Sequence, residues 1–232
     1  MSAPDSVDVV IPVHDGARYL GAAIDSVLAQ RGGPPCRVIV VDDGSTDDSA
    51  ALAAAYGPPV TLVRQPWSGA AAARNRGIAE SRAALLAFLD ADDLWPADSL
   101  ARRHAALVAE PRLEAVFGQV EQFVCERLAP EAQARLHCPP GLQPGYLLGA
   151  MLARASVFER FGRLDPTLGA ADFIAWFAAA RDQRLVDRMI DGLVLRRRLH
   201  DANLGLERRD LRQDYLRVVR AALRRKDEPG GP

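Results

Sequence analysis

Apolar and polar positions alternate between two periods along the first half of the chain. A β-branched apolar run at Val7–Val13 predicts a buried strand, and apolar residues recur at helical spacing over Tyr19–Gln30. The same alternation of strand and helix continues to Glu110. The further predicted strands are Arg37–Val41, Val60–Val63 and Leu85–Leu89, and the further predicted helices are Asp47–Tyr56, Gly69–Ser81 and Pro96–Glu110. This order favours an α/β fold with a mostly parallel central sheet and helices on both faces.

Two residue signals predict where helices begin in this half. Pro96 suits the first position of a helix, where no backbone N–H is needed. Ser45 or Thr46 has the side-chain oxygen that can cap the helix predicted at Asp47–Tyr56. Both signals support the strand-to-helix connections of the predicted sheet.

The pattern changes after Glu114. Ala115–Cys125 alternates as a strand does, whereas Glu126–Pro144 is rich in proline, glycine and charge and predicts a long loop. The remaining predicted elements are the strands Tyr146–Leu152 and Leu193–Leu199 and the helices Arg154–Phe161 and Ala171–Arg181. We therefore expect one domain over residues 1–205, with a first half at about 1–114 and a smaller, partly antiparallel second half at about 115–205. An amphipathic helix is predicted at 206–226, where Glu207–Arg225 carries an apolar face flanked by arginines, and a disordered tail at 227–232.

The composition is that of a globular protein with balanced charge. The 232 residues are 49% hydrophobic and 25% charged, and 29 Lys and Arg against 30 Asp and Glu give a net charge of −1. A protein without basic excess does not fit nucleic-acid binding. Lys226 is the single lysine, which excludes a phosphate-binding loop of the Walker type.

Several features predict a cytoplasmic protein without a transmembrane segment. Met1–Asp8 lacks the basic region of a secretory signal, and no stretch reaches the ~20 apolar residues that span a membrane. Cys36, Cys125 and Cys138 are odd in number and form no C-x-x-C pair, which argues against a disulfide framework or a structural zinc site. The amphipathic helix leaves peripheral contact with a membrane or pairing with a second copy open as alternatives to docking on the domain.

Acidic residues follow three of the predicted strands. They stand at His14-Asp15, at Asp42-Asp43 and at Asp90-Ala91-Asp92-Asp93. Ligands of open parallel sheets bind beyond the carboxyl ends of the strands, so these carboxylates are expected in one crevice. Clustered carboxylates favour a compensating Mg²⁺ or Mn²⁺ ion, although an acidic turn that caps the next helix is the alternative for the last group.

At this point the sequence resembles the family 2 glycosyltransferases, which have the GT-A fold. The matching stretches are Ile11–Gly16 with Tyr19-Leu20, Ser26–Gln30, Val40–Asp47, Ala73–Ile78 and Phe88–Asp93. They stand in the order and at the spacing of that family, and a weaker resemblance continues to about residue 205. The resemblance implies an inverting transfer of a sugar from a nucleoside diphosphate sugar, with UDP as the expected nucleotide, to an acceptor hydroxyl.

The resemblance also implies a set of residues that bind the nucleotide sugar. Asp43 would accept the N3 hydrogen of uracil, and Arg74 would supply charge near the phosphates. Where the family often has an aromatic residue, this chain has His14. The implied set is Pro12, Val13, His14, Asp15, Asp42, Asp43, Gly44, Gly69, Arg74, Asn75, Asp90, Ala91 and Asp92.

The metal and the catalytic base follow from the same resemblance. Asp92, with Asp90 and Asp93, corresponds to the element that chelates Mn²⁺ or Mg²⁺, and His200 matches a late element that approaches the metal, with a structural histidine as the alternative. Asp172 would be the base. It follows Ala171 where the family commonly has a glutamate, which keeps a second function open: a degenerate member that binds nucleotide or serves as a scaffold.

Other function classes fit less well. A nucleotidyltransferase needs a glycine-rich loop and lysines that this chain lacks, and no G-x-G-x-x-G of a dehydrogenase follows the first strand. Trp95 and Trp176 are expected in the core, with a border of the acceptor groove as the alternative. The acceptor, whether glycan, lipid, peptide or small molecule, is not encoded in any motif.

Overall fold

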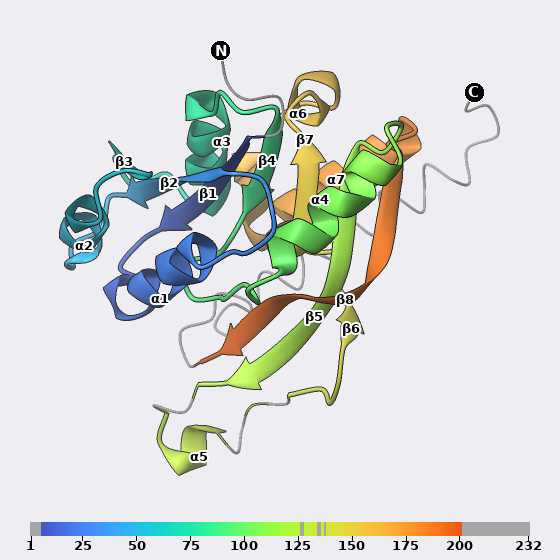
Figure 1. Cartoon of the computed structure of the whole chain (residues 1–232). Helices are drawn as coiled ribbons and strands as arrows, with labels where there is room; N and C mark the ends of the chain where they lie inside the picture. The colour runs from blue at the N-terminus through green and yellow to red at the C-terminus, as the bar shows by residue number, and fades with distance from the viewer. Residues whose placement is uncertain (1–5, 126–127, 134–135, 137, 201–232) are drawn as a thin grey trace.

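A single eight-stranded sheet organises the molecule (Figure 1). The computed structural model describes residues 6–125, 128–133, 136 and 138–200. The strand order is β3-β2-β1-β4-β7-β5-β6, and β8 pairs with β5. The strands are β1 Val7–Val13, β2 Cys36–Asp43, β3 Val60–Gln65, β4 Leu85–Phe88, β5 Ala115–Val124, β6 Gln143–Pro144, β7 Met151–Arg154 and β8 Asp187–Leu199.

The sheet has a parallel part and an antiparallel part. Strand β1 lies between β2 and β4 and runs parallel to both, and β3 continues the parallel part at the edge. Strand β7 then runs antiparallel to both β4 and β5, and β8 runs parallel to β5. The predicted α/β class is confirmed. The antiparallel element is a continuation of the central sheet.

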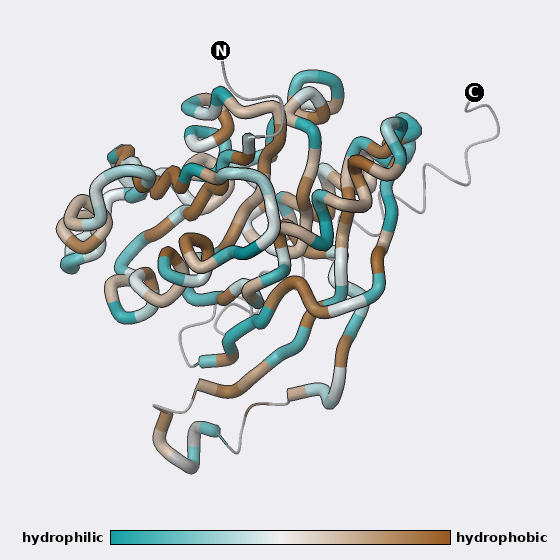
Figure 2. Tube along the Cα trace, in the orientation of Figure 1, coloured by the Kyte–Doolittle hydropathy of each residue, from teal (hydrophilic) through white to brown (hydrophobic). Residues whose placement is uncertain are grey.

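Helices cover both faces of this sheet, as the sequence pattern predicts. The helices are α1 Ala17–Leu28, α2 Ser49–Ala55, α3 Ala70–Glu80, α4 Ser99–Ala109, α5 Pro130–Gln133, α6 Val157–Arg160 and α7 Asp172–Asp182, with 3-10 turns η1 Leu148–Ala150 and η2 Pro166–Ala171. Side chains alternate along β1, so that Val9 and Ile11 join the core cluster of α1 while Val10 joins the cluster of α3 and α7. Figure 2 shows the apolar residues concentrated in the central strands.

Helix α3 lies directly against β1 because it has no side chain at the contact. A Cβ atom built on Gly77 would lie 2.2 Å from Cγ1 of Val10, which is fully buried. This close approach holds the amino-terminal end of α3 near the carboxyl end of the parallel strands. The predicted site residues at both places are thereby brought together.

Three elements of the second half differ from the sequence predictions. The strand predicted at Tyr146–Leu152 is wrong at its start, because 148–150 form a 3-10 turn and β7 begins at Met151. The carbonyl of Gly149 in that turn accepts the indole N–H of Trp95, which fixes it away from a strand ladder. The helix predicted at Arg154–Phe161 shortens to α6, because Arg154 still pairs with Leu85. The last strand begins earlier, at Asp187, where it pairs with Ala115.

Connections in the first half also differ in detail. Helix α4 begins at Ser99 and not at Pro96, because Pro96–Asp98 form a turn in which Ser99 N–H binds Pro96 O. The predicted long loop contains α5 and β6 in its described residues. Neither Ser45 nor Thr46 caps α2: its preceding residue, Asp48, makes no side-chain cap.

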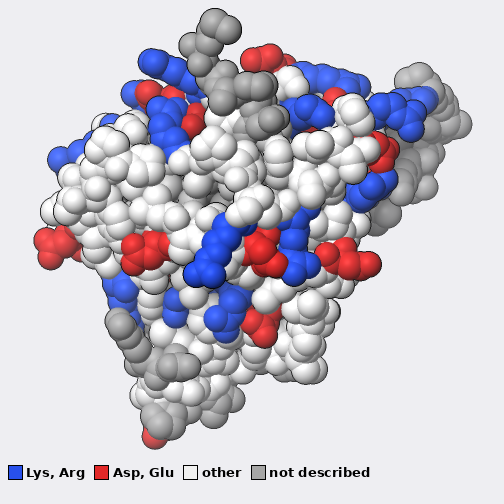
Figure 3. Space-filling view, in the orientation of Figure 1, with Lys and Arg blue, Asp and Glu red and all other residues white. Residues whose placement is uncertain are grey.

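Charged side chains of both signs are interspersed on the face shown in Figure 3, in keeping with the balanced composition. Among the helices that the structure describes, none has the length and apolarity needed to cross a bilayer. The helix predicted at 206–226 and the tail at 227–232 lie outside the described residues.

Candidate active site

The carboxyl ends of β1 and β2 lie side by side and place His14, Asp15 and Asp43 at one edge of the sheet. Val13 pairs with Asp42 in register, so the residues after each strand begin at the same level. Pro12 and Val13 are themselves buried in β1. The segment Pro12–His14, predicted to hold the nucleobase, is therefore the buried end of β1 followed by the exposed His14.

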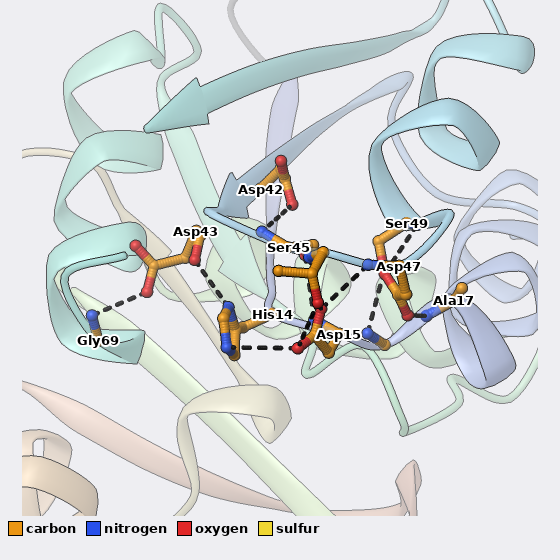
Figure 4. Close-up of polar contacts among 11 residues, drawn as sticks. His14, Asp15, Ala17, Asp42, Asp43, Ser45, Asp47, Ser49 and Gly69 are labelled. Carbon is orange, nitrogen blue, oxygen red and sulfur yellow. Dashed lines mark hydrogen bonds and ion pairs between the residues drawn. The ribbon is translucent and has the colours of Figure 1, made fainter. Parts of the chain in front are cut away.

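The loops after β1 and β2 brace each other through side chains (Figure 4). Asp15 Oδ1 accepts the Thr46 and Asp47 backbone N–H groups at 2.7 and 3.2 Å, and its own N–H donates to Ser45 Oγ. Asp47 Oδ2 accepts the Ala17 N–H at 2.9 Å. The hydrogen bond from Thr46 N–H lowers the pKa of Asp15 and keeps it ionised. In this structure Asp15 orders the loops, with its side chain 43% exposed.

Asp43 joins the end of β2 to the loop before α3. Its Oδ1 accepts hydrogen bonds from Gln65 Nε2 at 2.7 Å and from Ser68 N–H at 2.9 Å, and its Oδ2 accepts Gly69 N–H at 2.8 Å. The Asp43 carbonyl accepts the Nδ1 hydrogen of His14 at 2.8 Å, which fixes the tautomer of that ring. The predicted nucleotide residues His14, Asp43 and Gly69 thus form one connected group.

The buried side chain of Asp42 stabilises the same end of β2. Its side chain is fully buried, accepts Ser45 N–H and lies 3.3 Å from Arg64 Nε. Gly44 follows with φ +72, and a Cβ there would lie 2.7 Å from the Trp67 backbone nitrogen. Both residues shape the turn that carries Asp43.

Arg74 connects two predicted site carboxylates that are distant in sequence. It projects from α3, and its Nη2 donates to Asp90 Oδ1 at 2.8 Å while its Nη1 donates to Asp172 Oδ2 at 2.9 Å. The side chains of Arg74 and Asp172 are 13% and 2% exposed, and that of Asp90 is 48% exposed. The predicted base and the end of β4 are therefore joined by one guanidinium.

The electrostatics of this group favour a permanent positive charge on Arg74. Burial alone would lower the pKa of Arg74, but the charges and hydrogen bonds of Asp90 and Asp172 raise it above its ordinary value. Its Nε is buried and has no hydrogen-bond partner. A buried donor without a partner is energetically costly.

Asn75 lies next to this group but binds the backbone. Its Nδ2 donates to Leu164 O at 2.7 Å, and its Oδ1 accepts Leu164 N–H at 3.0 Å. Both ends of the side-chain amide are used. In this structure the residue fastens the segment before η2, and so indirectly α7 with Asp172, against α3.

Among the predicted metal ligands, the side chains of Asp92 and His200 are in contact. His200 Nε2 lies 2.8 Å from Asp92 Oδ2, and the ring of Tyr19 packs against His200 with centroids 4.8 Å apart. The Asp92 carboxylate suits Mn²⁺ or Mg²⁺, and the imidazole favours Mn²⁺ over Mg²⁺, when phosphate oxygens and water complete the coordination. The pair fits a metal held jointly with a ligand.

The structure does not bring the four predicted metal ligands together in one group. Within the described residues, no group of three or more His, Cys, Asp or Glu side chains is placed to hold an ion. Asp90 is bound to Arg74. Asp93 is 4% exposed and accepts Arg198 N–H at 2.8 Å. Burial, followed by the charges of Asp92 and Asp90, raises the pKa of Asp93 well above its ordinary value.

Sequence reasoning missed Gln65, Trp67 and Ser68, which follow or end β3 beside Asp43. The strand-end rule that selected the acidic residues also applies to the end of β3. None of these three residues is acidic, so the search for carboxylates did not find them. Trp67 is 67% exposed. Trp95 and Trp176 are buried at 4% and 5%, so their expected core position is confirmed.

A mixed α/β sheet with acidic residues at the carboxyl ends of its parallel strands places this chain in the class of GT-A proteins. The profile of Glycosyl transferase family 2 matches residues 8–166. The match covers more than half of the chain, and the chain belongs to this family.

Curated relatives match less than half of the chain. An uncharacterized glycosyltransferase of Rickettsia prowazekii is 36% identical over 89 residues, which cover 38% of this chain and 28% of the relative. The succinoglycan biosynthesis protein ExoU of Rhizobium meliloti is 40% identical over 98 residues, which cover 40% of this chain and 28% of that protein. The matched region thus spans less than a third of these relatives.

Solved structures share the fold over nearly the whole chain. S. aureus TarS in complex with UDP-GlcNAc superposes with a TM-score of 0.69 at 16% identity, covering 92% of this chain and 65% of that one. Mannosyltransferase PcManGT of Pyrobaculum calidifontis, in complex with GDP-Man and Mn²⁺, gives 0.69 at 20% identity, covering 97% and 65%. At these identities the similarity establishes the common fold.

Proposed function

We propose that this protein transfers a sugar from a nucleoside diphosphate sugar, with UDP as the nucleotide, to an acceptor hydroxyl with inversion at the anomeric carbon. The observation that carries the proposal is the linkage of Asp90 and Asp172 through Arg74. Asp172, proposed as the general base, and Asp90, at the strand end proposed for the donor, each bind a terminal nitrogen of this one guanidinium. Family membership supplies the reaction class.

The proposed reaction is a direct displacement. Asp172 takes the proton from the acceptor hydroxyl, whose oxygen forms the new bond to the anomeric carbon. The bond from that carbon to the diphosphate breaks, and the electron pair leaves with the nucleoside diphosphate. Arg74 would stabilise this developing negative charge through the Nη groups that Asp90 and Asp172 bind in this structure.

A divalent cation completes the proposed site. Asp92 and His200 would hold it, and Mn²⁺ or Mg²⁺ there would neutralise the leaving diphosphate. Asp92 has a 29% exposed side chain, so its carboxylate is accessible to a ligand. His200, by contrast, is nearly buried and packs on Tyr19, which fixes its ring.

Asp172 must become accessible for this chemistry. Its Oδ2 binds Arg74 and its side chain is 2% exposed, so an acceptor hydroxyl does not reach it in the described arrangement. A bound diphosphate competes with both carboxylates for Arg74. If phosphate oxygens replaced Asp172 as the partner of Arg74, the Asp172 carboxylate would be freed only after the donor is bound.

Acceptor and location complete the proposal. The nucleotide-binding and acceptor-binding halves are proposed as one domain over residues 1–205 acting in the cytoplasm, on a glycan, lipid, peptide or small-molecule acceptor. The segment 206–226 is proposed to dock on that domain, with pairing to a second copy or contact with a membrane surface as the other outcomes of a truncation test.

The experiment that tests the function is a donor screen on the full chain. Calorimetry with UDP and GDP, with and without Mn²⁺, measures nucleotide binding, and release of UDP from UDP-sugars measures turnover. Metal-dependent binding and slow donor hydrolysis are expected. If the full chain binds neither UDP nor GDP, the proposal is contradicted.

The second candidate function is a nucleotide-binding or scaffolding member without turnover. Ala171 stands where the family commonly has an acid, and Asp172 is buried in an ion pair. Tight UDP binding with no hydrolysis and no transfer to any acceptor tested would favour this function over the enzyme.

A further inference from the structure

Trp67 differs from the other tryptophans of the chain in its surroundings. Of the three tryptophans, Trp95 and Trp176 are buried and donate their indole N–H groups to the carbonyls of Gly149 and Gly162. Trp67 is 67% exposed. Large aromatic rings that remain accessible next to a polar site are typical of contacts with ligands.

The backbone that carries Trp67 is held rigidly although its ring is exposed. Asp43 accepts hydrogen bonds from Gln65 on one side of it and from Ser68 and Gly69 on the other. Gly44 lies so close to the Trp67 backbone nitrogen that no Cβ would fit between them. The backbone position from which the ring projects is thereby fixed, which lowers the backbone entropy lost on binding a ligand.

A second ring borders the same place. The His14 and Trp67 ring centroids are 6.4 Å apart, and their planes are inclined by 57°. The hydrogen bond from His14 Nδ1 to the Asp43 carbonyl fixes the His14 ring. Because the two rings are inclined, a flat ligand cannot lie parallel to both of them. It would stack on the face of Trp67, and the edge of the ligand would contact His14.

The position of Trp67 relative to the strands fits the nucleobase end of a nucleoside diphosphate. Trp67 follows β3 and Asp43 ends β2, whereas Asp92 follows β4, and β1 lies between β2 and β4. Neighbouring strands are ~4.8 Å apart. The end of β2 with Asp43 and the end of β4 before Asp92 are therefore separated by about 10 Å or more across the sheet. An extended nucleoside diphosphate bridges such a separation with its base at one end and its phosphates at the other.

We propose that Trp67 is the stacking platform for the nucleobase of the donor and a determinant of nucleotide affinity. The inference rests on the proposed function, since it assigns one part of the ligand of that same site. Stacking of a base on an aromatic face is worth about fivefold to 150-fold in affinity. His14 is a smaller neighbour, and Trp67 supplies the larger surface.

The experiment uses tryptophan fluorescence of the full chain, titrated with UDP, with GDP and with pyrophosphate. Trp67 is the tryptophan within reach of solvent, so its emission reports on the ligand, while Trp95 and Trp176 give a constant background. UDP is expected to quench the emission, and pyrophosphate, which has no base, is expected not to. In Trp67→Phe the quench is expected to disappear.

Calorimetry on the variants measures the contribution to affinity. Trp67→Ala is expected to weaken UDP binding about tenfold or more, and Trp67→Phe, which keeps a smaller ring, by less. Val108→Ala is the control, because Val108 is also apolar and 60% exposed but lies on α4. Its affinity for UDP is expected to equal that of the wild type, and thermal unfolding should show all variants folded.

The outcomes separate this inference from the proposed function. UDP that binds the wild type without any change in emission, and binds Trp67→Ala with wild-type affinity, overturns the inference and leaves the function standing. A quench seen with UDP-sugar but not with UDP assigns the ring to the sugar and also overturns it. Absence of nucleotide binding to the wild type overturns both.

Discussion

Arg74 Nη1 lies 2.9 Å from Asp172 Oδ2, although the two residues are 98 positions apart in the chain. The pair joins α3, which packs on the parallel strands, to the first residue of α7. Because the same guanidinium also binds Asp90, a change at any one of these residues alters the charge balance of the other two.

Asp172→Asn is expected to separate catalysis from binding. If Asp172 is the general base, sugar transfer should fall by roughly 10²-fold or more, while UDP affinity stays within a few-fold of wild type. Arg74 keeps Asp90 as a partner in this variant. Transfer rates and calorimetry on the same preparation check both halves. Transfer near the wild-type rate would exclude Asp172 as base, and loss of UDP binding would assign it a structural role.

Asp92 and Asp93 are adjacent but are expected to respond differently to substitution by asparagine. Asp92→Asn removes a charge from the pair proposed to hold the cation, so Mn²⁺ affinity and turnover should fall, turnover by roughly 10²-fold. Asp93→Asn should have little effect, because the Asp93 side chain is buried away from the proposed ion and Asn Oδ1 can still accept Arg198 N–H. Metal titrations of both variants check this. Equal losses in the two would contradict the assignment.

Gly77→Ala is expected to destabilise the fold, although alanine is normally better than glycine in a helix by ~1 kcal/mol. The new methyl group would overlap Val10, and overpacking of a core costs about 1–3 kcal/mol. The double variant Gly77→Ala with Val10→Ala should therefore lose less stability than the sum of the single variants. Urea unfolding measures all three, and strict additivity would show that the contact is not tight.

Asn75→Ala is expected to destabilise the protein by about 2 kcal/mol, because both hydrogen bonds to the Leu164 backbone are lost at ~1 kcal/mol each. Arg76→Ala is the matched control on the same helix, since its exposed ion pair with Glu80 is worth ~0.5 kcal/mol or less. Thermal unfolding compares the two. A loss in Asn75→Ala no larger than in the control would contradict the structural role.

Asp8 predicts part of the acid sensitivity of the fold. Burial alone would raise the pKa of Asp8, but hydrogen bonds from Arg37, Arg82 N–H and Ser81 outweigh it and hold that pKa below its ordinary value. A folded-state pKa below the unfolded value gives stability above pH ~4 that is lost as the pH falls through the folded-state pKa. In Asp8→Asn this contribution should be absent, so the wild type and the variant should converge in stability at low pH. Unfolding curves between neutral pH and about pH 3 test this.

Local pattern was sufficient for the first half of the fold. The β-branched run of β1 and the helical spacing of α1 follow from side-chain burial on each element, and burial repeats with the period of the element itself. The strand-end rule then predicts Asp15, Asp43 and Asp92 at one edge of the sheet. These inferences need only the direction and order of the strands.

The sequence alone did not predict the partners of each site residue. The insertion of β7 between β4 and β5, the two carboxylates on Arg74 and the use of Asn75 by Leu164 all join segments far apart in the chain. Such contacts depend on how the elements pack, which no local pattern encodes. The sequence determined which residue types stand at the edge of the sheet. Tertiary packing decided that Asp172 is buried, that Asp93 turns inward and that Trp67 remains exposed beside Asp43, because burial of each side chain depends on neighbours that other elements supply.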